Sequence, residues 1–257
     1  MSTLKENLLA VDGRIRAACA RAGRDPVDVR LIWVSKNHPR DRLVEAMGLG
    51  ARIFGENRVQ EVLEKFPLPA PESYAPDTRP PALHFIGRMQ KNKIRKVLPL
   101  AAAIHSIDSL DLLAAVDRVS GEIGVRTDLF LQVNTSREPA KGGFEPETLL
   151  STLGALPSLP HVRLVGLMTI GPLETASGEP AGPEEARRCF RELAAMLEAA
   201  RAQSAYGGPV PLGQLKDLAW LSMGMTGDFE VAIEEGAHFV RIGTGLFGAR
   251  PLPLTSA

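Results

Sequence analysis

The stretch VRLIWVSKNHP, residues 29–39, holds the pattern from which the fold is inferred. Its first part, residues 29–35, is an almost continuous apolar run with β-branched residues, which is typical of a strand buried on both faces. Lys36 follows this run directly, and Pro39 suits the first turn of a helix that we expect over residues 39–48. A strand followed at once by a helix is the repeating unit of α/β proteins.

Similar apolar runs recur along the whole chain. Together with 29–35 they give eight expected strands, the others being 51–54, 83–87, 103–107, 128–134, 162–168, 218–222 and 238–242. Helices are expected between the strands, near 57–66, 90–98, 109–120, 145–155, 184–204 and 227–235. A further helix precedes the first strand, because Thr3 and Glu6 have the spacing of a capping box and Gly23 can end the helix.

This alternation predicts an α/β fold, a single (β/α)8 barrel domain over residues 1–257 with an additional N-terminal helix. A doubly wound open sheet is the structural alternative. It usually has fewer strands, and no G-x-G-x-x-G follows the first strand here.

The composition excludes several classes of protein. Lys plus Arg and Asp plus Glu both number 30, so the formal net charge is zero, which argues against a sequence-independent nucleic-acid binder. A hydrophobic fraction of 44% indicates a folded chain. No apolar run reaches the roughly 18 residues of a membrane-spanning helix, and the N-terminus is charged where a signal peptide is apolar. The distant Cys19 and Cys189 indicate reduced thiols, so we expect a cytoplasmic protein.

Two segments interrupt the alternation. Residues 67–82 contain six prolines and are expected as a surface excursion before the third strand. Residues 171–183 are rich in glycine and proline and follow the sixth strand. They either cover a site or form a tolerated insertion.

Lys36 is the first candidate functional residue, because ligands of parallel barrels bind at the C-terminal ends of the strands. It ends an apolar run, so its amine is expected to be partly desolvated. Desolvation favours the neutral amine that forms a Schiff base. The alternative is a lysine whose stem covers apolar surface while its amine reaches solvent.

The second candidate is the sequence RIGTGLFG, residues 241–248, after the last strand. Gly243 and Thr244 would offer backbone N–H groups and a hydroxyl, a combination that binds phosphate. Ser222 and Met223 open the preceding loop, and phosphate sites of such barrels often use these last two loops. An ordinary glycine turn is the alternative.

The third candidate is Arg241, which only donates hydrogen bonds and stays charged. It either reaches the mouth of the barrel or pairs in the interior with a carboxylate such as that of Glu56. Five basic residues also lie within 88–96, but without aromatic neighbours they indicate a solvated face rather than a nucleic-acid site. The five histidines show no metal-ligand spacing.

Taken together, these stretches resemble the pyridoxal phosphate homeostasis proteins, relatives of the N-terminal barrel of alanine racemase. The matching motifs are VSKNHP (34–39), FGENRVQE (54–61), HFIGRMQKNK (84–93), LSMGMTGD (221–228) and VRIGTGLFG (240–248), with weaker matches at 133–143 and 166–170.

The resemblance implies roles for particular residues. Lys36 would form the internal aldimine with pyridoxal 5′-phosphate, Arg241 would face the pyridine nitrogen, and Asn57 would lie near the ring. The phosphate would be held by a group of residues from the last two loops, namely Ser222, Met223, Gly243 and Thr244.

The resemblance also implies a protein of cofactor homeostasis rather than an enzyme with an established turnover. Pyridoxal chemistry needs an electron-poor ring, and an arginine cannot keep the ring nitrogen protonated. Racemases with this barrel also use a tyrosine from an additional domain, whereas Tyr74 and Tyr206 are expected in connecting segments and the chain ends soon after Gly248. We therefore expect a reversible cofactor carrier, monomeric by default, with apoenzymes that depend on pyridoxal phosphate as recipients.

Three alternatives stay open at this point. An amino-acid racemase would exchange the α-proton of its substrate. A class I aldolase would form an adduct between Lys36 and a sugar phosphate without pyridoxal. A scaffold protein would use the basic residues 88–96 to hold a partner.

Overall fold

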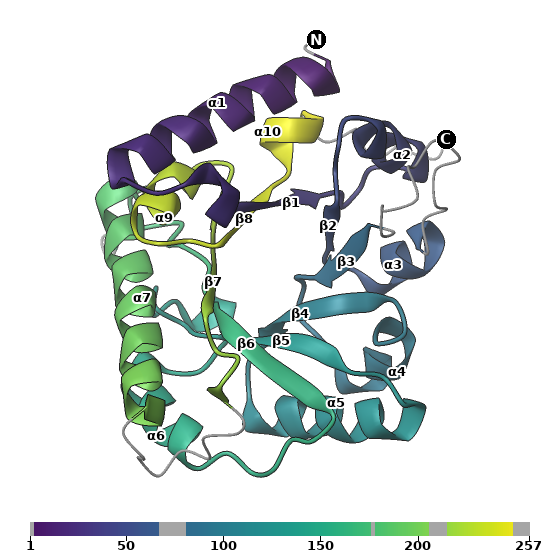
Figure 1. Cartoon of the computed structure of the whole chain (residues 1–257), viewed down its shortest axis with the longest axis vertical. Coiled ribbons are helices and arrows are strands. Elements are labelled where there is room, and N and C mark those ends of the chain that lie inside the picture. Colours follow the sequence, from purple (N-terminus) through teal and green to yellow (C-terminus); the bar gives the residue numbers. More distant parts are fainter. Residues whose placement is uncertain (1–2, 67–80, 176–177, 206–214, 249–257) are drawn as a thin grey trace.

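The computed structural model of this chain describes residues 3–66, 81–175, 178–205 and 215–248. Eight strands form a closed barrel in sequence order, and each strand is parallel to its neighbours (Figure 1). They are β1 (Arg30–Val34), β2 (Ile53–Glu56), β3 (Ala82–Phe85), β4 (Ala101–Ile107), β5 (Thr127–Gln132), β6 (Val162–Met168), β7 (Trp220–Met225) and β8 (Phe239–Ile242). The predicted barrel is confirmed, and the open sheet is excluded.

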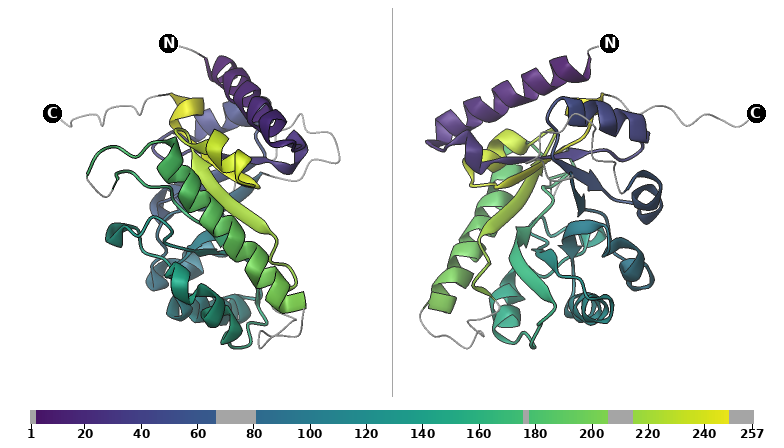
Figure 2. Two further views of the ribbon diagram at one scale, coloured as in Figure 1. Left: turned by 90° about the vertical axis from the view of Figure 1, so that its left-hand side faces the viewer. Right: turned by 45° about the vertical axis from the view of Figure 1, so that its right-hand side comes forward.

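Helices follow the strands and surround the barrel (Figures 1 and 2). They are α1 (Leu4–Ala22), α2 (Arg40–Gly48), α3 (Val59–Lys65), α4 (Ile94–Val97), α5 (Leu110–Ile123), α6 (Leu149–Gly154), α7 (Pro183–Ala205), α9 (Phe229–Glu234) and α10 (Thr244–Phe247). Short 3₁₀ turns occur at Pro26–Asp28, Lys91–Lys93, Pro139–Lys141 and Pro146–Thr148. Most of the expected segment 67–82 lies outside the described residues, as do Tyr74 and Tyr206.

The N-terminal helix α1 begins and ends as its sequence predicts. The Thr3 hydroxyl accepts a hydrogen bond from the Glu6 amide at 3.2 Å, and the Glu6 carboxylate accepts one from the Thr3 amide at 2.8 Å. Gly23 ends the helix with φ 64°, a left-handed conformation that glycine adopts without a Cβ clash. The buried face of α1 lies against α9 and α10, so this helix supports the last turn of the barrel (Figure 2).

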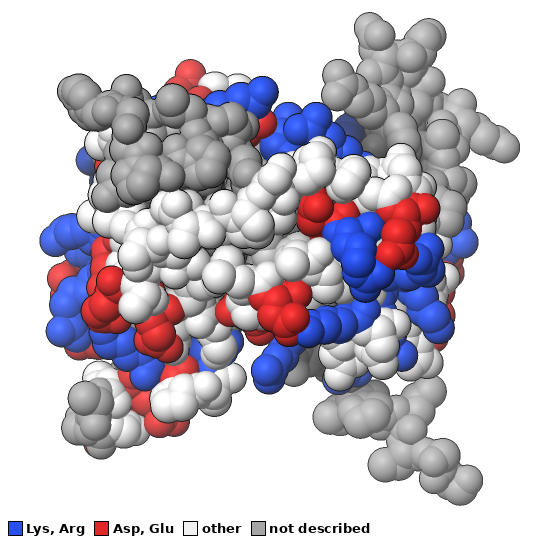
Figure 3. Space-filling model, turned by 90° about the horizontal axis from the view of Figure 1, so that it is seen from below, with Lys and Arg blue, Asp and Glu red and all other residues white. Residues whose placement is uncertain are grey.

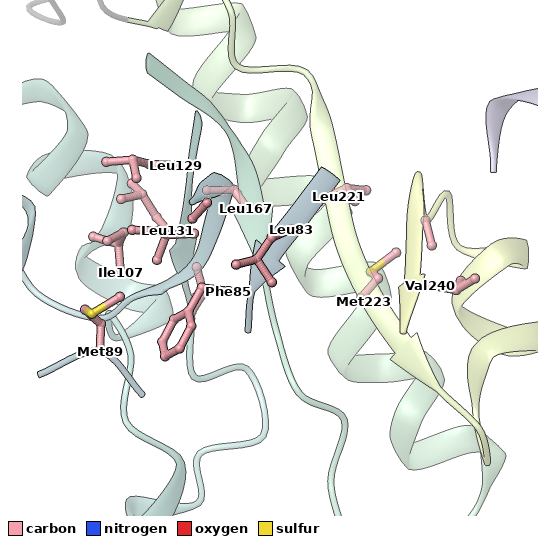
Figure 4. Packing of buried hydrophobic residues seen from close by; sticks show 14 of the residues in the cluster. Leu83, Phe85, Met89, Ile107, Leu129, Leu131, Leu167, Leu221, Met223 and Val240 are labelled. Carbon is pink, nitrogen blue, oxygen red and sulfur yellow. The ribbon is translucent and has the colours of Figure 1, made fainter. Parts of the chain in front are cut away.

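Strand β1 shows why the fold needs apolar residues on both faces. Ile32 and Val34 point into the barrel, where they pack with Phe130 and Phe239. Trp33 points the other way and joins the layer between strands and helices. Figure 4 shows side chains of that outer layer, which is the larger of the two apolar clusters.

Three elements differ from the prediction. Strand β7 runs to Met225 instead of ending at 222, because the register between β7 and β8 shifts between Ser222 and Met225, where Gly224 has φ 90°. A glycine with positive φ inside a strand is typical of a bulge, and the sequence alone suggested a loop there. Residues Thr244–Phe247 form the short helix α10, and the expected helix 90–98 is divided into a 3₁₀ turn and the single turn α4.

The surface carries charges of both signs. On the face drawn in Figure 3, basic and acidic side chains lie next to one another. Salt bridges such as Arg163–Asp128 at 2.7 Å are examples of this local pairing. Among the described helices, none combines the length and the apolar character that crossing a membrane requires.

Candidate functional site

A cavity of about 440 Å³ lies at the C-terminal ends of the strands, where barrels of this kind bind ligands. Five of the residues predicted from sequence line it, namely Lys36, Asn57, Arg241, Gly243 and Thr244. The remaining lining residues are Val34, Ile86, Gly87, Arg88, Met168, Ile170, Met225, Thr226 and Gly227. The structure therefore brings together side chains from both ends of the chain.

Side chains along a strand alternate between its two faces, and Lys36 follows Ile32 and Val34 in steps of two residues. Its side chain therefore points to the inner side of the barrel, as theirs do, and lines this cavity. Its side chain is half-buried, between apolar barrel and solvent. Asn37, the next residue, has φ 63°, so the chain turns sharply directly after Lys36. Asparagine tolerates this left-handed conformation better than most residues with a side chain.

A buried ionic cluster holds both neighbours of Lys36 in place. Lys65 is its centre, and its ammonium donates to Glu56 Oε1 at 2.7 Å, to Glu61 Oε2 at 2.6 Å and to the Ser35 carbonyl at 2.9 Å. The Ser35 hydroxyl donates to Glu56 at 2.6 Å, and the Asn37 amide donates to Glu61 at 2.6 Å. The loop that presents Lys36 is thus fixed on either side of it.

The two carboxylates of this cluster differ in their ionisation. Glu56 is fully buried, and desolvation raises its pKa even though Lys65 and Ser35 oppose the shift. Desolvation also acts to raise the pKa of Glu61, but hydrogen bonds from Lys65 and from the Asn37 amide outweigh it and lower that pKa. Lys65 lies within bonding distance of both groups, which offsets the cost of burying its own charge.

Arg241 is a buried cation whose hydrogen-bond acceptors are neutral. Its Nη1 donates to the Ser222 hydroxyl at 2.8 Å and its Nη2 to the Thr169 carbonyl at 2.8 Å. Burial lowers the pKa of Arg241 to about 10, so the guanidinium stays charged at neutral pH. The alternative partner Glu56 instead belongs to the Lys65 cluster.

Two histidines extend the Arg241 contacts into the barrel. His105 Nδ1 lies 2.8 Å from the Ser222 hydroxyl, and His105 Nε2 lies 2.9 Å from His84 Nδ1. His105 also stacks on Phe130, with ring centroids 4.1 Å apart. Desolvation lowers the pKa of His84 to about 3 and that of His105 well below its usual value, so both rings are neutral at pH 7. The chain from His84 to Arg241 therefore carries one positive charge, at the cavity end.

Ser222 and Met223 are the two predicted site residues that do not line the cavity. Both lie within β7, before its bulge. Ser222 accepts a hydrogen bond from Arg241, which lines the cavity, whereas Met223 packs in the outer apolar layer (Figure 4). The bulge moves Met225, Thr226 and Gly227 to the cavity wall instead.

The loops after β7 and β8 meet at Thr226 and Thr244, whose hydroxyl oxygens are 3.3 Å apart. Gly243 lies close to β1, since a Cβ there would make a tight contact of 3.3 Å with the Val34 carbonyl oxygen. Helix α10 is fastened to the loop of Lys36 by Phe247, whose ring stacks on His38 with centroids 4.8 Å apart. The Asn7 side chain of α1 donates to the Leu246 carbonyl at 2.7 Å, so α1 also holds this loop.

Sequence reasoning missed several residues of the cavity wall. Thr226 and Gly227 are among them, because the expected seventh strand ends at residue 222, three residues before the observed end at Met225. Gly87 and Arg88 carry a signal, since Gly87 ends the third expected strand, 83–87, and Arg88 follows it. Ile170 lies between the expected sixth strand, 162–168, and the expected loop 171–183. It was not predicted to line the cavity.

Comparison with known proteins gives the family. Residues 7–251 match the alanine racemase N-terminal domain family. The pyridoxal phosphate homeostasis protein of Aquifex aeolicus is 39% identical over 95% of this chain and 97% of its own length. The one from Pseudomonas aeruginosa is 41% identical over 97% of each chain.

A solved structure agrees with this result. PipY of Synechococcus elongatus with pyridoxal phosphate bound is 34% identical, with a TM-score of 0.73 over 96% of this chain and 100% of PipY. The resemblance seen in the motifs is therefore confirmed over nearly the full length of these relatives. This chain belongs to the family of pyridoxal phosphate homeostasis proteins, which share the barrel of the alanine racemase N-terminal domain.

Proposed function

We propose that this protein reversibly holds pyridoxal 5′-phosphate in the cavity at the C-terminal end of the barrel and thereby takes part in homeostasis of the cofactor. One observation carries the proposal: the amine of Lys36, the guanidinium of Arg241 and the hydroxyls of Thr226 and Thr244 line one cavity. The names of the relatives and the cofactor bound to PipY support the same ligand.

The donor set of the cavity fits this cofactor. The ligand supplies an aldehyde, which condenses with a primary amine with loss of water, together with a ring nitrogen and a phosphate. Lys36 provides the amine, and the two threonine hydroxyls provide donors for the phosphate. The buried Oδ1 of Asn57 has no hydrogen-bond partner among the described residues, which leaves it available to a ligand in the cavity that it lines.

The roles predicted from sequence are accordingly adjusted. We assign Lys36 to the covalent link, Arg241 to the ring nitrogen, and Gly243 and Thr244 to the phosphate, as the motifs imply. We add Thr226 to the phosphate contacts. Ser222 becomes a positioning residue that holds Arg241, and Met223 has a packing role.

We further propose that the protein is a carrier and not an enzyme. Arg241 keeps its proton at neutral pH because its pKa is about 10, and it offers the ring nitrogen only hydrogen-bond donation. It therefore does not protonate that nitrogen. An acidic side chain at this position would favour the protonated nitrogen. We expect transfer of the cofactor to apoenzymes, a monomeric state and a cytoplasmic location, the last in keeping with the free thiols of Cys19 and Cys189.

Borohydride reduction of the purified protein with added pyridoxal phosphate tests the covalent link. We expect one stable adduct per chain, located at Lys36 by peptide mass mapping, and no adduct or visible chromophore in Lys36→Ala. Lys5→Ala, on the exposed N-terminal helix, is the matched control and should bind like the wild type. Equal labelling of Lys36→Ala would exclude the assigned link.

The racemase alternative needs a separate experiment. Incubation with the common amino acids in deuterated water should give no exchange of the α-proton beyond that of free pyridoxal phosphate. Exchange that is catalytic in protein would contradict the carrier proposal and favour an enzyme.

A further inference from the structure

A second pocket, of about 500 Å³, adjoins the cofactor cavity on the side of β2 and β3. Asn57 and Arg88 line both spaces. The other lining residues of this second pocket are Arg58, Val59, Gln60, Leu63, Phe85, Gln90, Lys93 and Lys96. None of these other residues has a place in the proposed cofactor site.

The pocket is cationic in a chain whose net charge is zero. Four of its lining residues are Arg or Lys, and no Asp or Glu is among them. Arg88 approaches the Asp108 carboxylate only to 3.9 Å, and its side chain is 85% exposed. Positive potential is therefore concentrated over this pocket, and a concave surface of one sign of charge attracts a ligand of the other sign.

The excess of positive charge is local to the pocket, as the other cations of residues 91–96 show. Lys91 pairs with Asp111 and Arg95 pairs with Glu122, and neither of these two cations lines the pocket. Lys93 and Lys96 do line it, and no salt bridge joins either of them to a carboxylate of the described residues. Within the described part of the chain, Lys93 and Lys96, which line the pocket, thus lack the salt bridges that Lys91 and Arg95 form outside it.

The sequence motifs add an independent argument. Eight of the ten lining residues belong to the stretches FGENRVQE (54–61) and HFIGRMQKNK (84–93), by which the chain resembles its family. The cofactor cavity is lined by Asn57 from the first stretch and by Ile86, Gly87 and Arg88 from the second, and Glu56 and Glu61 of the first stretch hold the Lys36 loop. The other residues of these stretches that line the second pocket do not line the cofactor cavity, namely Arg58, Val59, Gln60, Phe85, Gln90 and Lys93.

We propose that this second pocket binds a small polyanion, either a di- or tricarboxylate or a phosphorylated compound. The four cations would neutralise the charged groups, and the side-chain amides of Gln60 and Gln90 would donate further hydrogen bonds. Val59, Leu63 and Phe85 provide apolar surface for a carbon skeleton. The volume lies within the range of small-molecule sites.

Binding in this pocket is coupled to the cofactor cavity through their common wall, a step that rests on the proposed function. A Cβ at Gly87 would lie 2.1 Å from the Asn57 carbonyl oxygen, so the loops after β2 and β3 are in direct backbone contact. A ligand that draws Asn57 or Arg88 toward the second pocket removes that side chain from the cofactor. The two ligands then change each other's affinity by the same factor.

Calorimetric titration of the cofactor-free full-length protein with citrate, and separately with pyrophosphate, tests the pocket itself. The double variant Lys93→Gln/Lys96→Gln should weaken binding of the preferred anion about tenfold or more, because each lost charged hydrogen bond contributes appreciably to affinity. Lys91→Gln/Arg95→Gln removes the same charge from the same segment outside the pocket and should change binding by less than about twofold. Preference for citrate would identify a carboxylate ligand, and preference for pyrophosphate a phosphorylated one.

Equal binding by the wild type and Lys93→Gln/Lys96→Gln would overturn the proposal, as would binding of polyglutamate but of neither small anion, which would indicate an acidic protein partner. The coupling is measured as the rate at which bound pyridoxal phosphate is lost to a trapping apoenzyme, with and without the anion. We expect the anion to change this rate at least about threefold in the wild type and not in the pocket variant. A wild type that binds the anion but no cofactor would refute the proposed function and leave the anion site standing.

Discussion

Two buried polar networks flank the cavity, and they are built on opposite principles. Beneath the loop of Lys36, the ammonium of Lys65 lies within 2.7 Å of two carboxylates. On the neighbouring strand β8, Arg241 is held by a hydroxyl and a carbonyl, and two neutral histidines lie behind the hydroxyl. In the first network the charged groups of Lys65, Glu56 and Glu61 pair with one another. In the second network the positive charge of Arg241 faces the cavity.

The difference shows what each network contributes. A cluster whose charged groups bind one another and the backbone fixes a loop, which suits a loop that must present an amine. A cation with neutral acceptors keeps its positive field and its remaining N–H donors for a ligand. Its desolvation is partly offset by Asp228, whose charge acts on Arg241 from the loop after β7.

Removing the centre of the ionic network should have the largest effect. Lys65→Met leaves Glu56 buried and without its cation, so we expect a loss of about 3–5 kcal/mol in the free energy of unfolding, measured with urea. In the remaining folded protein, reaction of Lys36 with pyridoxal should slow, because its loop loses the hydrogen bond from Lys65 to the Ser35 carbonyl. Glu56 and Glu61, which bind the Ser35 hydroxyl and the Asn37 amide, also lose their hydrogen bonds from Lys65.

Arg163→Met is the control for this prediction. It breaks the pair between Arg163 and Asp128, which is partly exposed, and should cost about 0–1 kcal/mol. A cost for Lys65→Met no greater than this would mean that the cluster does not hold the Lys36 loop.

The neutral network should make stability depend on pH. The pKa of His84 is about 3 in the folded chain and near 6.5 in the unfolded one. Above about pH 6.5 neither state binds the proton, so stability is unaffected; as the pH falls from 6.5 toward 3, only the unfolded state is protonated and stability is lost. For His84 this amounts to about 2 kcal/mol at pH 5 relative to pH 8.

Urea titrations of the wild type and His84→Gln at these two pH values measure this effect. The variant has no titrating ring at residue 84, so its difference in unfolding free energy between pH 8 and pH 5 should be smaller by about 2 kcal/mol. An unchanged difference would mean that His84 is protonated in the folded chain.

Ser222→Ala tests the link between the histidines and Arg241. It removes the acceptor of Arg241 Nη1 and the partner of His105, and we expect a cost of about 1–2 kcal/mol in the free energy of unfolding. Retention of pyridoxal phosphate should fall several-fold as well. Ser222→Thr keeps the hydroxyl and should restore both properties if the hydroxyl is what matters.

The smallest effect is expected at Asn37, where the chain turns after Lys36. Asn37→Gly should change the free energy of unfolding by less than about 0.5 kcal/mol, because glycine adopts the observed φ of 63° freely. Asn37→Ala should cost about 1 kcal/mol. Equal stabilities of the two variants, measured by thermal unfolding, would show that the turn is not strained.

Most of the barrel could be predicted from the sequence, and the exceptions are instructive. All eight strands were located, because a strand buried on both faces is a short apolar run that is recognisable by itself. The end of β7 was misplaced, because a bulge depends on pairing with β8. The helix expected over 90–98 is shorter and begins with a 3₁₀ turn, a difference that the apolar spacing alone did not reveal.

The sequence by itself determined the order of strands and helices, the place of Lys36 at a strand end and the candidacy of Arg241, because periodicity and chain order are local properties. The tertiary structure decided that Ser222 supports Arg241, that Thr226 lines the cavity and that Lys65 lies beneath Lys36. These three facts depend on register, a one-residue bulge and the meeting of elements remote in the chain. Such relations arise only when strands pair and their side chains compete for the same buried space.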